Sequence, residues 1–119
     1  MKLEELQVYT LSMETAEKIW TIVIEWDYFT RDTIGKQLVR AADSIAANLS
    51  EGFGRYHYKE NTNFSYYSRG SLYETKTWLI KAHNRKLVSN DDYESFIHEI
   101  DNIGIKLNNY IKSIGKSPN

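Results

Sequence analysis

The sequence predicts an all-α protein, an up-down-up-down antiparallel four-helix bundle formed by one domain over residues 1–119. Apolar residues recur at three- and four-residue steps along almost the whole chain, and no sustained strand-like alternation appears. Short polar or glycine-containing segments divide this helical pattern into four parts. Short connections make consecutive helices antiparallel, and 119 residues suffice for one hydrophobic core.

The first helix is expected from Lys2 to Trp26. Its core-facing stripe is expected to comprise Leu3, Leu6, Met13, Ala16, Trp20, Val23 and Ile24. The polar segment Asp27–Thr33 interrupts the pattern. Within it Thr30 and Asp32 are candidate N-caps for the next helix, because their side-chain oxygens can accept hydrogen bonds from free backbone N–H groups.

The second helix is expected from Thr33 to Gly54. Its stripe is small and aliphatic: Ile34, Leu38, Ala42, Ile45, Leu49 and Gly52. Two glycines, Gly52 and Gly54, lie where a helix should fray or end.

The third helix is expected over Lys59–Leu87, with a stripe of Phe64, Tyr67, Ser71, Thr75, Trp78 and Ala82. Ser89 or Asn90 can cap the fourth helix, and the acidic residues that follow suit the positive end of a helix dipole. The fourth helix has the clearest heptad-like repeat, formed by Tyr93, Phe96 or Ile97, Ile100, Ile103, Leu107, Tyr110 or Ile111, and Ile114.

Two segments, Gly35–Arg55 and Arg69–Glu74, combine small residues with a few polar groups inside helical patterning. Small residues allow helices to approach closely, and polar groups at a packed contact need hydrogen-bond partners. We therefore predict that the polar residues form a structural network or an interface between subunits: Arg40, Ser44, Asn48, Glu51, Arg69, Ser71 and Glu74. The alternative is that they face water.

The sequence offers little for catalysis. Cysteine is absent, and His57, His83 and His98 are widely separated without metal-ligand spacing. No nucleophile elbow or phosphate-binding glycine loop is present. We expect a non-enzyme with no catalytic residues, metal or cofactor. The charged N-terminus and the lack of a long apolar run predict a cytoplasmic protein without membrane contact.

Charge is unevenly distributed although the net charge is only −1. Residues 1–29 hold two basic and six acidic side chains, whereas residues 30–88 hold ten basic and five acidic ones. Cations alternate with aromatic residues after the second helix and recur at the end of the third, which favours nucleic-acid binding. The candidates are Arg55, Tyr56, Tyr58, Lys59, Lys76, Lys81, Arg85 and Lys86. Alternatively, the tyrosines are half-buried bundle and interface residues, and the acidic segments simply pack beside the basic ones.

The two segments resemble the bacterial four-helix bundle proteins named after 23S rRNA intervening sequences. That family's pattern, roughly QLRRAAxSIxxNIAEGxxR followed by FLxxAxGSLxEL, corresponds to QLVRAADSIAANLSEGFGR and to Phe64–Glu74 here. The matches are Gln37, Leu38, Arg40, Ala41, Ala42, Ser44, Ile45, Asn48, Glu51, Gly52, Arg55, Phe64, Gly70, Ser71, Leu72 and Glu74. The departures are Val39, Leu49, Ser50, Ser65 and Ser68, with Val39 replacing an arginine.

The resemblance covers essentially the whole chain and implies a homo-oligomer, typically a pentameric ring. Similar proteins include the accessory subunit of diversity-generating retroelements, a basic pentamer thought to bind nucleic acid and a reverse transcriptase. We predict a non-enzymatic scaffold or adaptor that associates with itself and with RNA or DNA. The alternative is a scaffold whose only other partner is a protein.

Overall fold

A computed structural model describes residues 1–116; the predicted domain's last three residues, 117–119, lie outside the described part. A short 3₁₀ turn, Leu3–Glu5, precedes α1 (Gln7–Val23). Then follow α2 (Tyr28–Thr30), a π-helical turn (Arg31–Gly35) and α3 (Lys36–Phe53). The chain continues with α4 (Tyr58–Asn84) and α5 (Asn90–Ser113).

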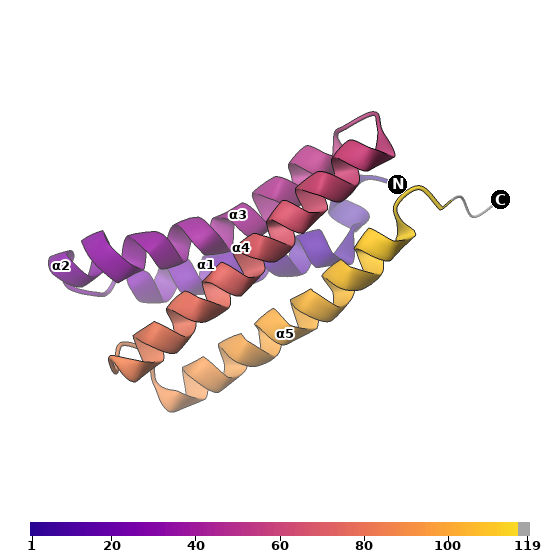
Figure 1. Cartoon of the computed structure of the whole chain (residues 1–119). Coiled ribbons are helices and arrows are strands. Elements are labelled where there is room, and N and C mark those ends of the chain that lie inside the picture. The colour runs from indigo at the N-terminus through magenta and orange to yellow at the C-terminus, as the bar shows by residue number, and fades with distance from the viewer. Residues whose placement is uncertain (117–119) are drawn as a thin grey trace.

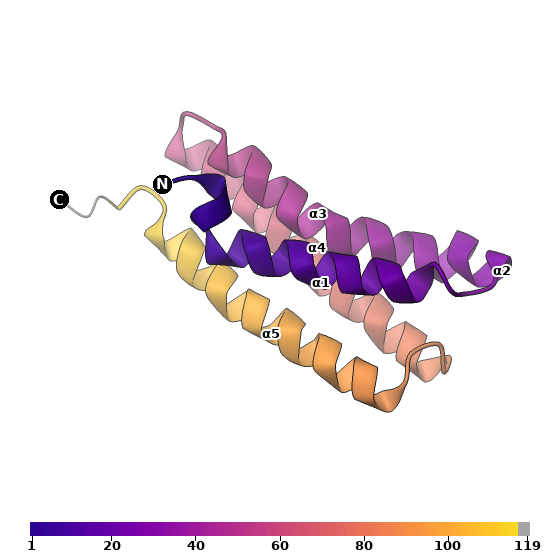
Figure 2. The ribbon, with the colours of Figure 1, turned by 180° about the vertical axis from the view of Figure 1, so that it is seen from behind.

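The helices form the predicted up-down-up-down bundle, since each long helix runs opposite to the one before it (Figure 1). Around the bundle, α1 packs against α3, α3 against α4, α4 against α5, and α5 against α1. Figure 2 shows α1 between α3 and α5. The bundle is elongated, with extents of 51 × 24 × 20 Å.

The core stripe of α3 is confirmed, because Ile34, Leu38, Ala42, Ile45, Leu49 and Gly52 are all buried. The α5 stripe is confirmed except at its end: Phe96, Ile100, Ile103 and Leu107 are buried, and the flanking Tyr93, Ile97, Tyr110 and Ile111 pack against the core. Ile114 follows the last residue of α5. Both helices have well-separated apolar and polar faces, and such faces define a helix orientation clearly.

The predicted stripe of α1 is partly wrong. Met13, Trp20 and Ile24 are exposed at 44%, 50% and 41%. The buried residues of α1 are Val8, Ser12, Thr15, Ala16, Ile19 and Val23. Two of them carry hydroxyl groups, and each hydroxyl donates a hydrogen bond. Ser12 Oγ donates to the Val8 carbonyl at 2.7 Å within α1, and Thr15 Oγ1 donates to Glu99 at 2.9 Å across the bundle.

The stripe of α4 is rotated from the predicted one by about one residue. The buried residues are Ser65, Ser68, Leu72, Thr75, Leu79 and Ala82, whereas Tyr67 is exposed and Ser71 only half-buried. Ser68 Oγ donates to the Ile45 carbonyl at 2.7 Å, so a buried serine ties α4 to α3. The tight packing continues at Gly52, where a Cβ would lie 2.9 Å from the Phe64 Cβ.

The predicted start of the second helix is also corrected. Asp27 is the cap, because its carboxylate accepts from the Thr30 N–H at 2.8 Å, whereas Thr30 and Asp32 lie inside the helical segment. The helical path therefore begins at Tyr28, five residues before the predicted start at Thr33. The Thr30 backbone hydrogen bond lowers the pKa of the Asp27 carboxyl.

The connection from α4 to α5 uses two defined caps. Lys86 adopts a positive φ of 62°, and Lys86 N–H and Leu87 N–H donate to the His83 and Ala82 carbonyls, which is the Schellman arrangement. Ser89 caps α5 as predicted, accepting from the Asp92 N–H at 3.1 Å. The helix therefore begins at Asn90, before the acidic pair Asp91 and Asp92.

Candidate interaction surfaces

The polar residues of the two small-residue segments lie mainly along the outer α3/α4 seam. The helices pair antiparallel there, with Ile45 beside Ser68 and Gly52 beside Phe64. This register places Ser44 level with Ser71 and Arg40 level with Glu74. Ser44, Asn48 and Ser71 are half-buried, and Arg40, Glu51 and Glu74 are exposed.

Within residues 1–116 the hydrogen bonds of these seam residues are local, so the predicted structural network does not join α3 to α4 inside one chain. Ser44 Oγ donates to the Arg40 carbonyl at 2.7 Å, and Asn48 Nδ2 to the Ser44 carbonyl at 3.0 Å. The Glu74 carboxylate accepts from Trp78 Nε1 at 3.2 Å, one turn further along α4.

The physical reason is the rotation of α4, which turns Glu74 outward. Glu51 pairs with Arg55, and Arg69 donates to Asn108 of α5 at 3.2 Å. A role of the seven residues at an interface between copies stays a prediction.

The nucleic-acid candidates are divided between the two ends of α4. Arg55, Tyr56, Tyr58 and Lys59 lie at the α3/α4 turn, and Lys81, Arg85 and Lys86 at the α4/α5 turn. At 1.5 Å per residue, Lys59 and Lys81 are roughly 33 Å apart along the helix. The candidates thus form two separate clusters at the ends of α4, as their two positions in the sequence indicate, with Lys76 between them.

Two of the candidate cations are already paired. Arg55 binds Glu51 and lies over the Phe64 ring, 4.9 Å from its centroid. Lys76 donates to Asp101 at 2.9 Å, and this hydrogen bond raises the pKa of Lys76. In the part of the chain that the structure describes, Lys59, Lys81, Arg85 and Lys86 have no carboxylate within 4 Å.

The tyrosines at the α3/α4 turn are exposed in the single chain. Tyr56 is 91% exposed and packs its ring edge-on against His57, and Tyr58 is 67% exposed. Tyr56 and Tyr58 are therefore not buried within the bundle of one chain, and the alternative that they are interface residues stays a prediction.

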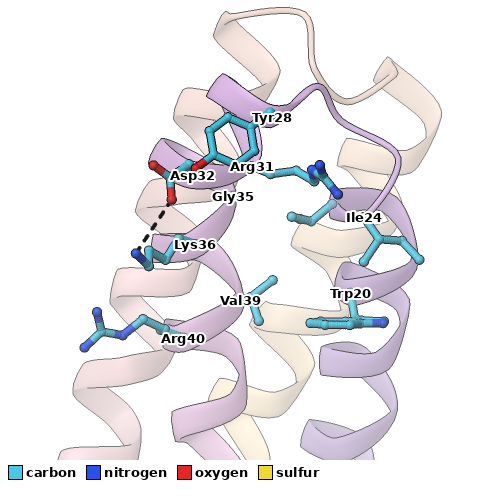
Figure 3. A pocket seen from close by; sticks show the side chains of 10 residues that line it. Trp20, Ile24, Tyr28, Arg31, Asp32, Gly35, Lys36, Val39 and Arg40 are labelled. Carbon is cyan, nitrogen blue, oxygen red and sulfur yellow. Dashed lines mark ion pairs between the residues drawn. The ribbon is translucent and has the colours of Figure 1, made fainter.

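A groove between α1 and α3 was not predicted. At one end it has a volume of about 540 Å³ and an apolar floor that includes Trp20, Val23 and Val39, as Figure 3 shows for Trp20 and Val39. Arg31, Arg40 and the Lys36–Asp32 ion pair stand at its rim (Figure 3). The groove continues along the same two helices past Tyr9, Met13, Ala46, Ala47 and Ser50.

The continuation of the groove contains two acidic side chains, Glu17 of α1 and Asp43 of α3. Burial, and to a smaller extent the charge of Glu17, raises the pKa of the Asp43 carboxyl. Neither carboxylate has a cation within 4 Å among the described residues. The groove therefore presents an unneutralised acidic pair beside apolar surface.

A second surface runs along α4 and α5. Tyr66, Tyr73 and Ile80 are spaced by seven residues, which places them on one side of α4, and they are exposed at 45%, 63% and 39%. Ile105 of α5, 63% exposed, lies across from Tyr73 in the shallow groove between the two helices. We call these four residues the α4 row.

The signal for both surfaces was present in the sequence. The heptad spacing of Tyr66, Tyr73 and Ile80 could have been noticed, and Met13, Trp20 and Ile24 were noticed but assigned to the core.

No group of three or more potential metal ligands occurs within residues 1–116. His83 instead contacts Asn90 at 2.7 Å and stacks on Tyr93, with ring centroids 4.0 Å apart. None of the helices in the described part of the chain is long and apolar enough to cross a membrane.

A family model described as 23S rRNA-intervening sequence protein matches residues 4–109. The chain belongs to this family. Among solved structures, it is similar to a protein of unknown function from the S23 ribosomal protein family of Bacteroides thetaiotaomicron. The two are 24% identical with a TM-score of 0.79, over 88% of this chain and 98% of that one. At this identity the likeness shows the fold. No curated protein matches the chain.

The 23S rRNA-intervening sequence protein match spans both motif segments, and it also covers both of the surfaces that sequence reasoning missed. The resemblance drawn from Gly35–Arg55 and Arg69–Glu74 is thus confirmed.

Proposed function

We propose that this 23S rRNA-intervening sequence protein is a non-enzymatic scaffold that works as a homo-oligomer, a ring of five copies. The observation that supports self-association is the presence of two separate exposed apolar surfaces, the α1/α3 groove and the α4 row, on a chain of 119 residues. Contiguous exposed apolar surface on a small protein is typical of interfaces. Two different surfaces on one chain suit a ring, in which each copy contacts two neighbours.

The test is the molar mass in solution, measured by light scattering with sedimentation velocity between low and high micromolar concentration. A closed ring gives one species at an integral multiple of 14.0 kDa whose mass does not grow with concentration. A 14.0 kDa species at every concentration would contradict the proposal.

A second candidate function is association with RNA at the α3/α4 turn. It is favoured by the exposed Tyr56 and Tyr58 beside the unpaired Lys59, because stacking combined with phosphate contact binds unpaired nucleotides. A ring repeats this modest cluster once per copy, and multivalency strengthens weak contacts. If no RNA binds even at low salt, the protein-only scaffold is the better description.

The experiment measures binding of a structured RNA with single-stranded loops at several salt concentrations. Affinity should fall steeply as salt rises, and the Arg55→Ala/Lys59→Ala variant should lose about two units of the log–log slope. Lys18→Ala/Lys106→Ala removes two cations on the α1/α5 side of the bundle, outside the groove and the α4 row, and is the matched control. Arg85→Ala/Lys86→Ala tests the second cation cluster, and an equal loss in all three variants would contradict a specific site.

A further inference from the structure

The α1/α3 groove and the α4 row lie on different sides of the bundle and have similar lengths. In the order of packing around the bundle, α1 and α3 form one side and α4 and α5 the other. From Tyr66 to Ile80 the row spans 14 residues, about 21 Å at 1.5 Å per residue. On α3 the groove extends from Lys36 to Ser50, the same number of residues, and before α3 its lining continues to Tyr28.

Gly70 lies between Tyr66 and Tyr73 on α4, and no contact within its own chain requires a glycine at this position. A Cβ at this position would meet nothing within 4 Å, unlike one at Gly52. Glycine inside a helix costs about 1 kcal/mol relative to alanine. A glycine in open space beside exposed aromatic rings suits the close approach of another backbone from outside the chain.

The middle of the groove is acidic and lysines accompany the row, whereas Arg31 and Arg40 stand at one end of the groove. The groove holds the unpaired Glu17 and Asp43, whereas unpaired lysines accompany the row: Lys59 lies seven residues before Tyr66, and Lys81 follows Ile80. Pairing two grooves would bring the acidic pairs together, and pairing two rows would bring the lysines together. Groove against row avoids both of these like-charge contacts.

We infer that the α4 row of one copy lies in the α1/α3 groove of the next. The inference rests on the proposed homo-oligomer and specifies its interface. Such a contact is heterologous: each copy uses its groove toward one neighbour and its row toward the other, which generates a closed ring when the rotation closes.

The experiment uses one variant for each surface and measures mass by sedimentation velocity. Gly70→Arg fills the open space on the row, and Ala47→Arg, at an exposed position of the groove rim, blocks the groove. Each variant alone should sediment as a single 14.0 kDa chain. An equimolar mixture should form a species of twice that mass, because one intact groove and one intact row remain, and it should stop there.

Several controls keep the result interpretable. His98→Arg adds the same side chain at an exposed α5 position outside both surfaces, and it should assemble like the wild type. Circular dichroism checks that each variant is helical. If Ala47→Arg does not fold, Met13→Arg replaces it, since Met13 is 44% exposed in the same groove.

The outcomes separate the two ideas. A wild type that assembles, together with a Gly70→Arg variant of unchanged mass or a mixture that stays single, overturns the groove–row contact and leaves the homo-oligomer standing. A wild type that is a single chain overturns both.

Discussion

Lys86 ends α4 in the left-handed region, with φ at 62°, where a side chain with a Cβ is disfavoured. Lys86→Gly should therefore stabilise the protein by about 1 kcal/mol, measured as a higher midpoint of thermal unfolding. Lys86→Ala is the matched control, since it removes the charge and keeps the Cβ. An equal gain in both variants would mean that the charge matters and the backbone does not.

Glu74 was predicted to belong to a structural network or to an interface between subunits. In the structure it is exposed and accepts one hydrogen bond from Trp78, one turn away on the same helix. Glu74→Ala should change the free energy of unfolding of the dissociated chain by less than about 0.5 kcal/mol, as surface substitutions usually do. Urea unfolding in an Ala47→Arg background measures this; a loss several times larger would restore the network.

Asp43 should make the free energy of unfolding of the dissociated chain depend on pH, in a defined direction. Burial raises its pKa in the folded state, so the folded chain binds the proton more tightly than the unfolded chain does. Stability of the dissociated chain should fall as pH rises from below the ordinary aspartate pKa of about 3.9 through the raised value. Asp43→Asn should thus stabilise the Gly70→Arg chain at pH 7 and make little difference at pH 3. Equal effects at the two pH values would contradict this.

At the scale of the helix, sequence reasoning worked where apolar and polar residues separate cleanly. The faces of α3 and α5 were predicted because aliphatic residues such as Leu38 and Ile103 occupy one arc. It failed on α1 and α4, where serine and threonine are buried and tryptophan and tyrosine are exposed. Buried hydroxyls such as those of Ser12 and Ser68 donate to backbone carbonyls, a satisfaction that a hydrophobic pattern does not reveal.

Gly52 and Gly70 belong to different helices and should respond oppositely to alanine. A Cβ at Gly52 would collide with Asn61 and Phe64, so Gly52→Ala should destabilise by about 1–3 kcal/mol. A Cβ at Gly70 meets nothing within the chain, so Gly70→Ala should stabilise the dissociated chain by up to about 1 kcal/mol. Both are compared by urea unfolding in the Ala47→Arg background. A destabilising Gly70→Ala would indicate a contact within the chain at that position.

For the whole molecule, the predicted fold was right, and the nucleic-acid role of the candidate cations stays a prediction. Arg55 and Arg85 both belong to the basic part of the sequence, but they lie at opposite ends of α4, a helix of 27 residues. The apolar surfaces depend on which side of each helix faces the core, and a rotation of one residue moves a side chain by about 100° around the axis. The hydrophobic periodicity of α4 does not define its rotation about the helix axis to within one residue.

The elongated shape gives a prediction for scattering. The radius of gyration of the Cα atoms is 15.0 Å, whereas a typical compact chain of this length has about 13.5 Å. Small-angle X-ray scattering of the dissociated Gly70→Arg chain should give a value near the former, and the wild type a clearly larger one. Identical values for both proteins would argue against assembly of the wild type.

The π-helical turn at Arg31–Gly35 changes the direction in which side chains point around the helix axis, while the helix itself continues without a break. The hydrogen-bonded ring of a π-helical turn contains one residue more than that of an α-helix. The side chains before the turn are therefore rotated by about 100° around the helix axis relative to those of α3. Tyr28 reaches the groove in Figure 3 from beyond this turn. Deleting one residue of this turn would keep the segment helical but rotate Tyr28 to another position around the helix axis. The number of residues at this point therefore shapes the groove as much as residue identity does.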